Sequence, residues 1–172
     1  MASAALLAVR GGSLVGVAAT AYALYVELQM AAAKKRDEQY EALCDIHAGS
    51  CTAVLGSSYS HILSHWGLVA PGSALDLSNA VMGMLFYVAA AFHDWWLAPL
   101  PVNPSLVLLL ASSGALAFSA YLAWVLKYIL RDFCVVCVTM YVANLCIFAG
   151  ALFLWFNGGG GGGGGGGRLK QA

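Results

Sequence analysis

The chain has 172 residues, of which 61% are hydrophobic and 9% are charged, and its eight Lys and Arg residues balance eight Asp and Glu residues. A soluble domain carries about 25% charged residues, so this composition excludes an ordinary soluble domain and a disordered chain. A nucleic-acid-binding protein needs an excess of positive charge, which is absent here. The composition predicts an all-α integral membrane protein, and the length favours a single domain.

The first predicted element is an apolar transmembrane helix over residues 11–33. Its one charged residue, Glu27, is expected near an end of the helix, where a long side chain can reach the membrane interface. Ala19-Thr20-Ala21 also fits the cleavage site of a signal peptide. The apolar stretch continues beyond that site, which favours a retained helix.

Residues 34–76 are predicted to form a polar loop that begins with a charged cluster, Lys34-Lys35-Arg36-Asp37-Glu38. Within this loop, one amphipathic segment ends at Pro71-Gly72 and carries four apolar residues at helical spacing: Ile62, Leu63, Trp66 and Val69. Such a segment is typical of a lid that lies on the membrane surface, and equally of a loop that only touches the interface.

Three further spans are predicted at residues 77–97, 104–127 and 133–156, because each contains an apolar run close to the length that a bilayer requires. The span at 77–97 is the least regular and ends with Trp95 and Trp96, which suit the membrane interface. Residues 1–157 are therefore expected to form a four-transmembrane-helix bundle with a loop or amphipathic lid. The ten glycines of 158–167 predict a disordered tail over 158–172.

The cysteines carry the clearest chemical signal. Cys44 and Cys51 lie in the first loop, and Cys134 and Cys137 form a Cys-x-x-Cys motif at the start of the last span. Four spans place both pairs on one side of the membrane, as direct thiol–disulfide exchange requires. Four cysteines could also bind zinc, but six residues separate the first pair, unlike a zinc knuckle. We expect redox chemistry and no metal.

Helix geometry places four side chains on one stripe of the last span, namely Cys134, Cys137, Tyr141 and Asn144. Cys146 falls on the opposite face and is expected only to pack. Asp132 is expected to cap the helix, which would put Cys134 in the first turn, where the helix dipole favours a thiolate. Such a stripe suits a lipid-soluble substrate, although Tyr141 and Asn144 could instead form hydrogen bonds between helices.

Two further points concern the side of the membrane that holds the cysteines. Ser78 and Asn79 begin the second span there, so Asn79 is either a helix cap or an amide that binds a substrate carbonyl. The positive-inside rule mildly favours the cytosol for this side, whereas disulfide chemistry favours an oxidising lumen. We expect the cysteines to face the lumen.

These fragments together resemble the vitamin K epoxide reductase family. The similarity covers about residues 22–156 and lies in Tyr22-Ala23-Leu24, Ala42-Leu43-Cys44-Asp45, Ser50-Cys51, Ser78-Asn79, Tyr121-Leu122-Ala123-Trp124 and Asp132-Phe133-Cys134-Val135-Val136-Cys137-Val138-Thr139-Met140-Tyr141. The resemblance implies a multi-pass protein of the endoplasmic reticulum membrane that reduces vitamin K epoxide to the quinone, and the quinone to the hydroquinone. No tightly bound cofactor is expected, because two thiols supply two electrons.

The resemblance also implies roles for individual residues. Cys134 and Cys137 would be the active-site pair, with Cys137 meeting the substrate, and Cys44 and Cys51 would be the redox shuttle. Cys51 would exchange with Cys134, and Cys44 with a luminal thioredoxin-like oxidoreductase. Asn79 and Tyr141 would donate hydrogen bonds to the two ends of the quinone ring.

Two other interpretations are considered. A quinone-linked disulfide-forming oxidase would use similar chemistry, but its product would be the oxidised partner protein. A four-span scaffold of the tetraspanin type would use its cysteines only to staple a large outer loop. The short connection at residues 127–132 and the Cys-x-x-Cys motif argue against the scaffold.

Overall fold

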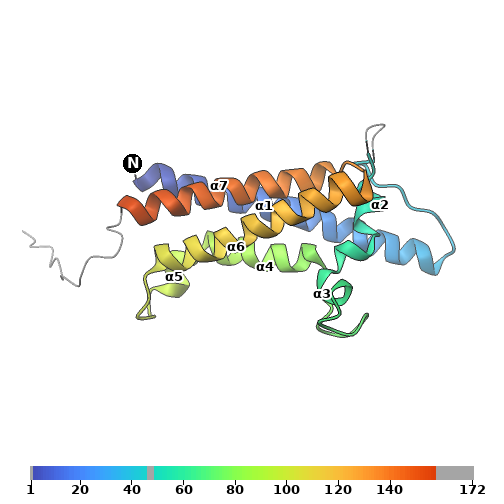
Figure 1. Cartoon of the computed structure of the whole chain (residues 1–172), viewed down its shortest axis with the longest axis horizontal. Coiled ribbons are helices and arrows are strands. Elements are labelled where there is room, and N and C mark those ends of the chain that lie inside the picture. The colour runs from blue at the N-terminus through green and yellow to red at the C-terminus, as the bar shows by residue number, and fades with distance from the viewer. Residues whose placement is uncertain (1, 46–48, 158–172) are drawn as a thin grey trace, which may run out of the picture.

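The computed structural model describes residues 2–45 and 49–157, and this part of the chain is helical without strands (Figure 1). Its elements are α1 (Ala2–Lys35), α2 (Cys51–Leu55), η1 (Ser58–Ser60), α3 (Ile62–His65), α4 (Asn79–Ala91), α5 (His93–Leu97), α6 (Pro104–Trp124), η2 (Val125–Leu130) and α7 (Val135–Asn157). The expected all-α class is confirmed for these residues. The tail predicted to be disordered lies outside them.

Three helical stretches are long and apolar enough to cross a membrane: Ser3–Lys35, Pro104–Leu130 and Val135–Asn157. The first begins well before the expected start at residue 11. The second continues past the expected end at residue 127, because α6 passes directly into the π-helical turn η2. The chain is therefore compatible with a membrane protein by the length and composition of these helices.

Residues 77–97 form two helices rather than the single helix that was expected. α4 has 13 residues, about 20 Å at 1.5 Å per residue, which is shorter than the roughly 30 Å core of a bilayer. Its last carbonyls are taken by side chains: His93 Nδ1 lies 2.9 Å from the Ala90 oxygen, and Trp96 Nε1 donates to the Ala89 oxygen at 2.9 Å. These contacts end α4 and turn the chain into α5.

Helix α1 packs against both α7 and α4, and α6 packs against α7 (Figure 1). α1 runs unbroken through Ala19–Ala21, and its Val9, Thr20 and Ala23 are fully buried. This helix is thus part of the core of the bundle, as expected for a retained helix. The buried residues form two clusters, one around the cysteines at one end of the bundle and one toward the opposite end.

The segment expected to be amphipathic is a single helical turn, α3, followed by a turn at Gly67. Ile62 is buried, whereas Trp66 is exposed and its ring lies 5.6 Å from that of Tyr121 on α6. In Figure 1, α2 lies at the end of the bundle where α7 begins, and α3 projects from the bundle near the start of α4. We use the word lid only as a name for residues 57–76.

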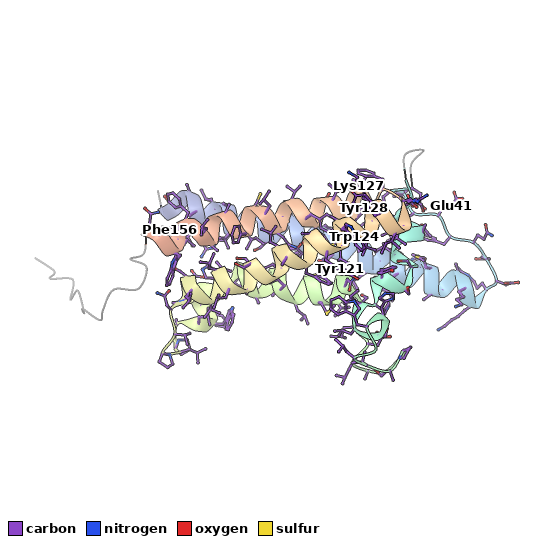
Figure 2. The ribbon with its side chains drawn as sticks, in the orientation of Figure 1. Glu41, Tyr121, Trp124, Lys127, Tyr128 and Phe156 are labelled. Carbon is purple, nitrogen blue, oxygen red and sulfur yellow. A yellow bond between two sulfur atoms is a disulfide. The ribbon has the colours of Figure 1, made fainter. Side chains whose placement is uncertain are left out.

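An aromatic row runs along the outer surface of α6 and η2 at the same end of the molecule (Figure 2). The rings of Tyr121, Trp124 and Tyr128 follow one another at centroid distances of 6.4 and 6.2 Å, and Lys127 Nζ lies 5.4 Å from the Tyr128 ring. Exposed Tyr and Trp beside Lys are typical of the membrane–water interface.

Candidate active site

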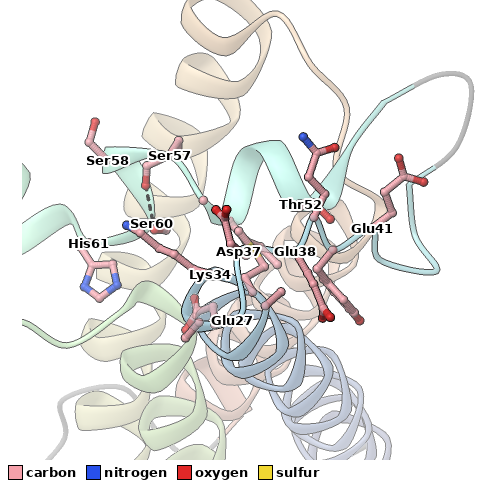
Figure 3. A pocket seen from close by; sticks show the side chains of 17 residues that line it. Glu27, Lys34, Asp37, Glu38, Glu41, Thr52, Ser57, Ser58, Ser60 and His61 are labelled. Carbon is pink, nitrogen blue, oxygen red and sulfur yellow. Dashed lines mark hydrogen bonds between the residues drawn. The ribbon is translucent and has the colours of Figure 1, made fainter.

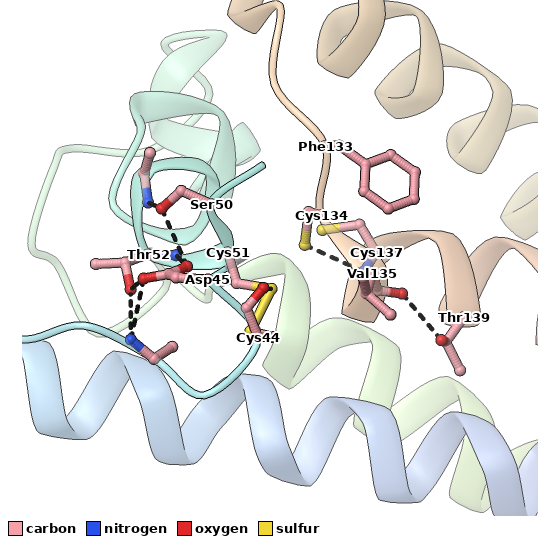
Figure 4. The surroundings of a disulfide bond; sticks show 12 residues. Cys44, Asp45, Ser50, Cys51, Thr52, Phe133, Cys134, Val135, Cys137 and Thr139 are labelled. Carbon is pink, nitrogen blue, oxygen red and sulfur yellow. Dashed lines mark hydrogen bonds between the residues drawn. A yellow bond between two sulfur atoms is a disulfide. The ribbon is translucent and has the colours of Figure 1, made fainter. Parts of the chain in front are cut away.

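Cys134 is the residue that caps α7. Its carbonyl accepts the first helical hydrogen bond, from the Val138 N–H at 3.0 Å, and its Sγ accepts the Cys137 N–H at 3.2 Å (Figure 4). The prediction that Asp132 caps this helix is wrong. The Asp132 carboxylate instead accepts hydrogen bonds from the N–H groups of Phe133 and Ser50.

The capping position changes the acidity of the Cys134 thiol. A hydrogen bond from the Cys137 thiol lowers the pKa of Cys134 most; burial opposes this effect, and the N–H groups of Cys137 and Val136 reinforce it. A thiol of lowered pKa is the better leaving group in thiol–disulfide exchange. Cys134 is therefore suited to be released as a thiolate.

The expected stripe is present on α7. Cys137 and Asn144 are buried and Tyr141 is half-buried, whereas Cys146 is exposed on the other side of the helix. The Asn144 amide donates to Ser119 Oγ of α6 at 2.7 Å. Asn144 thus forms a hydrogen bond between two helices, which was the alternative to substrate binding for this residue.

Two adjacent cavities share part of their lining, and the smaller one borders Cys137. The smaller one, about 60 Å³, is lined by the side chains of Cys137, Tyr141, Asn79 and Glu27 among others. The larger one, about 380 Å³ and mostly apolar, runs between α4, α6 and the lid. They share four lining residues: Asn79, Leu122, Met140 and Tyr141. The larger cavity falls within the size range of small-molecule sites and lies next to the cavity that the Cys137 thiol lines.

Asn79 lies where α4, the lid and both cavities meet. Ser78 is the N-cap of α4, because its Oγ accepts the Val81 N–H. The Asn79 side chain instead binds the lid: Nδ2 donates to the Tyr59 carbonyl at 2.7 Å, and Oδ1 accepts the Ile62 N–H at 3.4 Å. This side chain therefore fastens residues 57–76 to the start of α4, beside the cavities that it also lines.

Cys44 and Cys51 form a disulfide with Cα atoms 5.8 Å apart, while Cys134 and Cys137 are free thiols (Figure 4). Cys51 is fully buried at the start of α2 and belongs to the same packed cluster as Cys134 and Cys137. Both pairs therefore lie at the same end of the described bundle, and their common side of the membrane stays a prediction. The described residues contain one cluster with metal-ligand geometry, around Cys44 and Cys51, but those two sulfurs are bonded to each other.

The loop that carries this disulfide is organised by Asp45, a residue that sequence reasoning did not single out. Its carboxylate accepts hydrogen bonds from the Ala42 N–H, the Ser50 hydroxyl, and both the N–H and hydroxyl of Thr52 (Figure 4). Burial acts to raise the pKa of Asp45, but the hydrogen bonds from Thr52, Ala42 and Ser50 outweigh it and lower the pKa. The only sequence signal is an acidic residue followed closely by Ser and Thr.

The comparisons with known proteins agree with this geometry. The sequence matches the model of the vitamin K epoxide reductase family over residues 7–152. A Mus musculus protein named vitamin K epoxide reductase complex subunit 1 is 37% identical over 139 residues, which cover 76% of this chain and 78% of the mouse protein. The Rattus norvegicus protein of that name is 35% identical over 152 residues, 84% of each chain. The matched region contains both cysteine pairs.

Proposed function

Because this chain belongs to the vitamin K epoxide reductase family, we propose that it reduces vitamin K epoxide to the quinone, and the quinone to the hydroquinone, within a membrane. One observation carries the proposal to the residue level: the buried Cys137 thiol lines a small cavity that shares four lining residues with a larger apolar one, and the Cys134 thiol lies one helical turn away. A buried thiol pair beside an apolar cavity suits a two-electron reduction of a lipid-soluble ring.

The chemistry assigned to this pair balances with two electrons. Cys137 passes its proton to Cys134 along the hydrogen bond between the two thiols, attacks the ring and forms a carbon–sulfur bond. Cys134 then attacks the Cys137 sulfur, the carbon–sulfur bond breaks, and its electron pair stays on the substrate. The two thiols become one disulfide, and the substrate takes up two protons. For the epoxide, the oxygen leaves as water.

Asn79 and Tyr141 are assigned to the substrate oxygens. Both line the two cavities, and hydrogen-bond donors in a dry site stabilise negative charge that develops on oxygen. One Asn79 N–H already binds Tyr59, but an amide group has a second N–H to offer. The same side chain can therefore hold the lid and bind substrate.

The second cysteine pair is assigned to re-reduction of the first. The Cys51 thiolate attacks the Cys134 sulfur and releases Cys137, and Cys44 then attacks Cys51 and releases Cys134 as a thiolate. The electrons would come from a luminal thioredoxin-like protein that reduces the Cys44–Cys51 disulfide. This assignment places the cysteine end of the bundle in the lumen of the endoplasmic reticulum, where disulfides persist.

The decisive experiment is turnover of vitamin K epoxide by the purified full-length chain in detergent, with a small dithiol as reductant. We expect turnover by the unsubstituted chain, none by Cys137→Ala, and unchanged turnover by Cys146→Ala, a matched change at an exposed cysteine on the same helix. An unsubstituted chain that does not turn over the epoxide, or a Cys137→Ala variant that does, would contradict the proposal.

A further inference from the structure

Glu27 is an acidic residue in the apolar helix α1, and its position differs from what the sequence suggests. It was expected to reach the membrane interface, yet its side chain is half-buried beneath the lid. Its Oε1 is shielded from solvent and has no partner at full hydrogen-bond geometry among the described residues, and the Ser78 hydroxyl is its nearest polar neighbour on α4. Burying a carboxylate oxygen without a partner is unfavourable, so this position calls for a functional reason.

The Glu27 carboxyl lies between a small cavity and a large, open depression. On one side is the cavity of about 60 Å³ that is lined by Cys137 and Tyr141. On the other is an open depression of about 840 Å³ at the loop end of α1 (Figure 3). Four residues line both: Glu27, Leu55, Ser57 and Ser60. Glu27 is the one titratable residue among them.

The groups that face the carboxyl differ between the two sides. Besides Glu27, the depression is lined by six titratable residues: Lys34, Asp37, Glu38, Tyr40, Glu41 and His61. Besides Glu27, three titratable residues line the small cavity: Tyr59, Cys137 and Tyr141. Ser78, at the start of α4, is a further polar neighbour of Glu27. The carboxyl therefore borders an open depression on one side and the cavity that Cys137 also lines on the other.

We infer that Glu27 carries protons from water in the open depression to the substrate oxygen in the cavity beside Cys137. This inference rests on the proposed function, in which the substrate takes up two protons in a site shielded from water. The Glu27 O–H bond breaks as an O–H bond forms on the substrate. The carboxylate then regains a proton from water in the depression. The two protons lost by the thiols return to water, so the overall reaction stays balanced.

The direction of the pH dependence follows from this role. The protonated carboxyl is the form that donates, so turnover falls as pH rises through the pKa of Glu27. A glutamine at this position keeps the size and polarity of the side chain but cannot release a proton in this range. The Glu27→Gln variant should therefore turn over the epoxide more slowly, and its turnover should no longer fall as pH rises through this range.

The test compares three full-length variants with the unsubstituted chain, using vitamin K epoxide and a small dithiol across a range of pH. We expect kcat of Glu27→Gln to fall on the order of 100-fold with little change in KM, as is typical for loss of a general acid. Glu27→Asp should restore part of kcat together with the alkaline fall in rate. Glu41→Gln, which changes another carboxyl of the depression that does not line the small cavity, should behave as the unsubstituted chain.

The inference is overturned if Glu27→Gln keeps the kcat and pH profile of the unsubstituted chain. It is also overturned if Glu27→Gln loses activity through a higher KM, or through a lower thermal unfolding temperature that Glu27→Asp does not restore, since these would indicate a structural role. Failure of the unsubstituted chain to turn over the epoxide would contradict the proposed function itself, and is recorded separately in the same assay.

Discussion

The backbone N–H of Ser50 donates a hydrogen bond to the Asp132 carboxylate at 2.8 Å. Ser50 immediately precedes Cys51, and Asp132 lies two residues before Cys134, so this bond ties together the two segments that carry the cysteine pairs. The segments are 82 residues apart in sequence. Their alignment at one end of the bundle therefore depends on contacts of this kind, in addition to the packing of the helices.

The first prediction concerns this tether. Asp132→Ala removes the acceptor and should slow turnover driven by a protein thiol about tenfold, because a charge-assisted hydrogen bond of about 1.5 kcal/mol is lost. Turnover driven by a small dithiol, which can reduce the Cys134–Cys137 pair directly, should change little. Asp132→Asn keeps an acceptor oxygen and is the control. Equal losses of turnover in both assays would mean that Asp132 supports the structure of the whole site and not the exchange between the two cysteine pairs.

A second prediction follows from the placement of Cys51 and Cys134 in one buried cluster. In a Cys44→Ser variant that has been oxidised by quinone, Cys51 can attack Cys134, but no thiol remains to release it. We expect a Cys51–Cys134 disulfide in peptides mapped by mass spectrometry without reduction, and none in a Cys146→Ser control. Detection of the Cys134–Cys137 disulfide alone would argue against direct exchange between the pairs.

The acidity of Cys134 gives a third prediction. The Cys137 thiol lowers the pKa of Cys134 by donating a hydrogen bond, and a serine hydroxyl can replace that donor. In a background lacking Cys146, the thiolate of Cys134 should therefore appear at lower pH in Cys137→Ser than in Cys137→Ala. Ultraviolet absorbance of the thiolate measures both titrations. Identical titrations would show that the backbone N–H groups alone set the acidity.

Much of the site could be predicted from the sequence, because it depends on regular geometry. The helical period sets the stripe that holds Cys137 and Tyr141. The expectation that both cysteine pairs share one side relied on four spans, whereas three of the described helices are long enough to cross a membrane. The parts that could not be predicted depend on single side chains that bind backbone groups. Asp45 fastens the disulfide loop, and His93 helps to end α4. Such contacts leave no periodic signal in the sequence.

The position of Glu27 illustrates a different limit. A charged residue near the end of an apolar run suggests a side chain that reaches toward water through lipid headgroups. In the structure, the loop and lid fold back over this end of α1, so the carboxyl lies beneath protein instead. The error came from treating the helix alone, since the cover is supplied by residues about 30 positions away in the sequence, such as Ser57 and Ser60.

A fourth prediction separates the roles of Asn79 and Tyr141. Asn79→Ala removes two hydrogen bonds to the lid, so it should raise KM for the epoxide and also speed proteolysis within residues 57–76. Tyr141→Phe removes only a hydroxyl at the cavities and should weaken substrate binding without exposing the lid to protease. Unchanged kinetics in Tyr141→Phe would leave that residue with a packing role.

The last prediction concerns the close contact between α1 and α4. A Cβ atom added at Gly16 would lie 2.5 Å from Cε1 of Tyr87, whose side chain is buried and donates to the Met140 carbonyl at 3.1 Å. The ring cannot move aside without breaking that bond, so Gly16→Ala should reduce the free energy of unfolding in detergent by about 1–3 kcal/mol.

Gly11, on the same helix, has no atom within 4 Å of an added Cβ. Gly11→Ala should therefore be neutral or stabilise the helix by up to about 1 kcal/mol. A Gly16→Ala variant as stable as Gly11→Ala would show that α1 and α4 are less tightly packed than this contact requires.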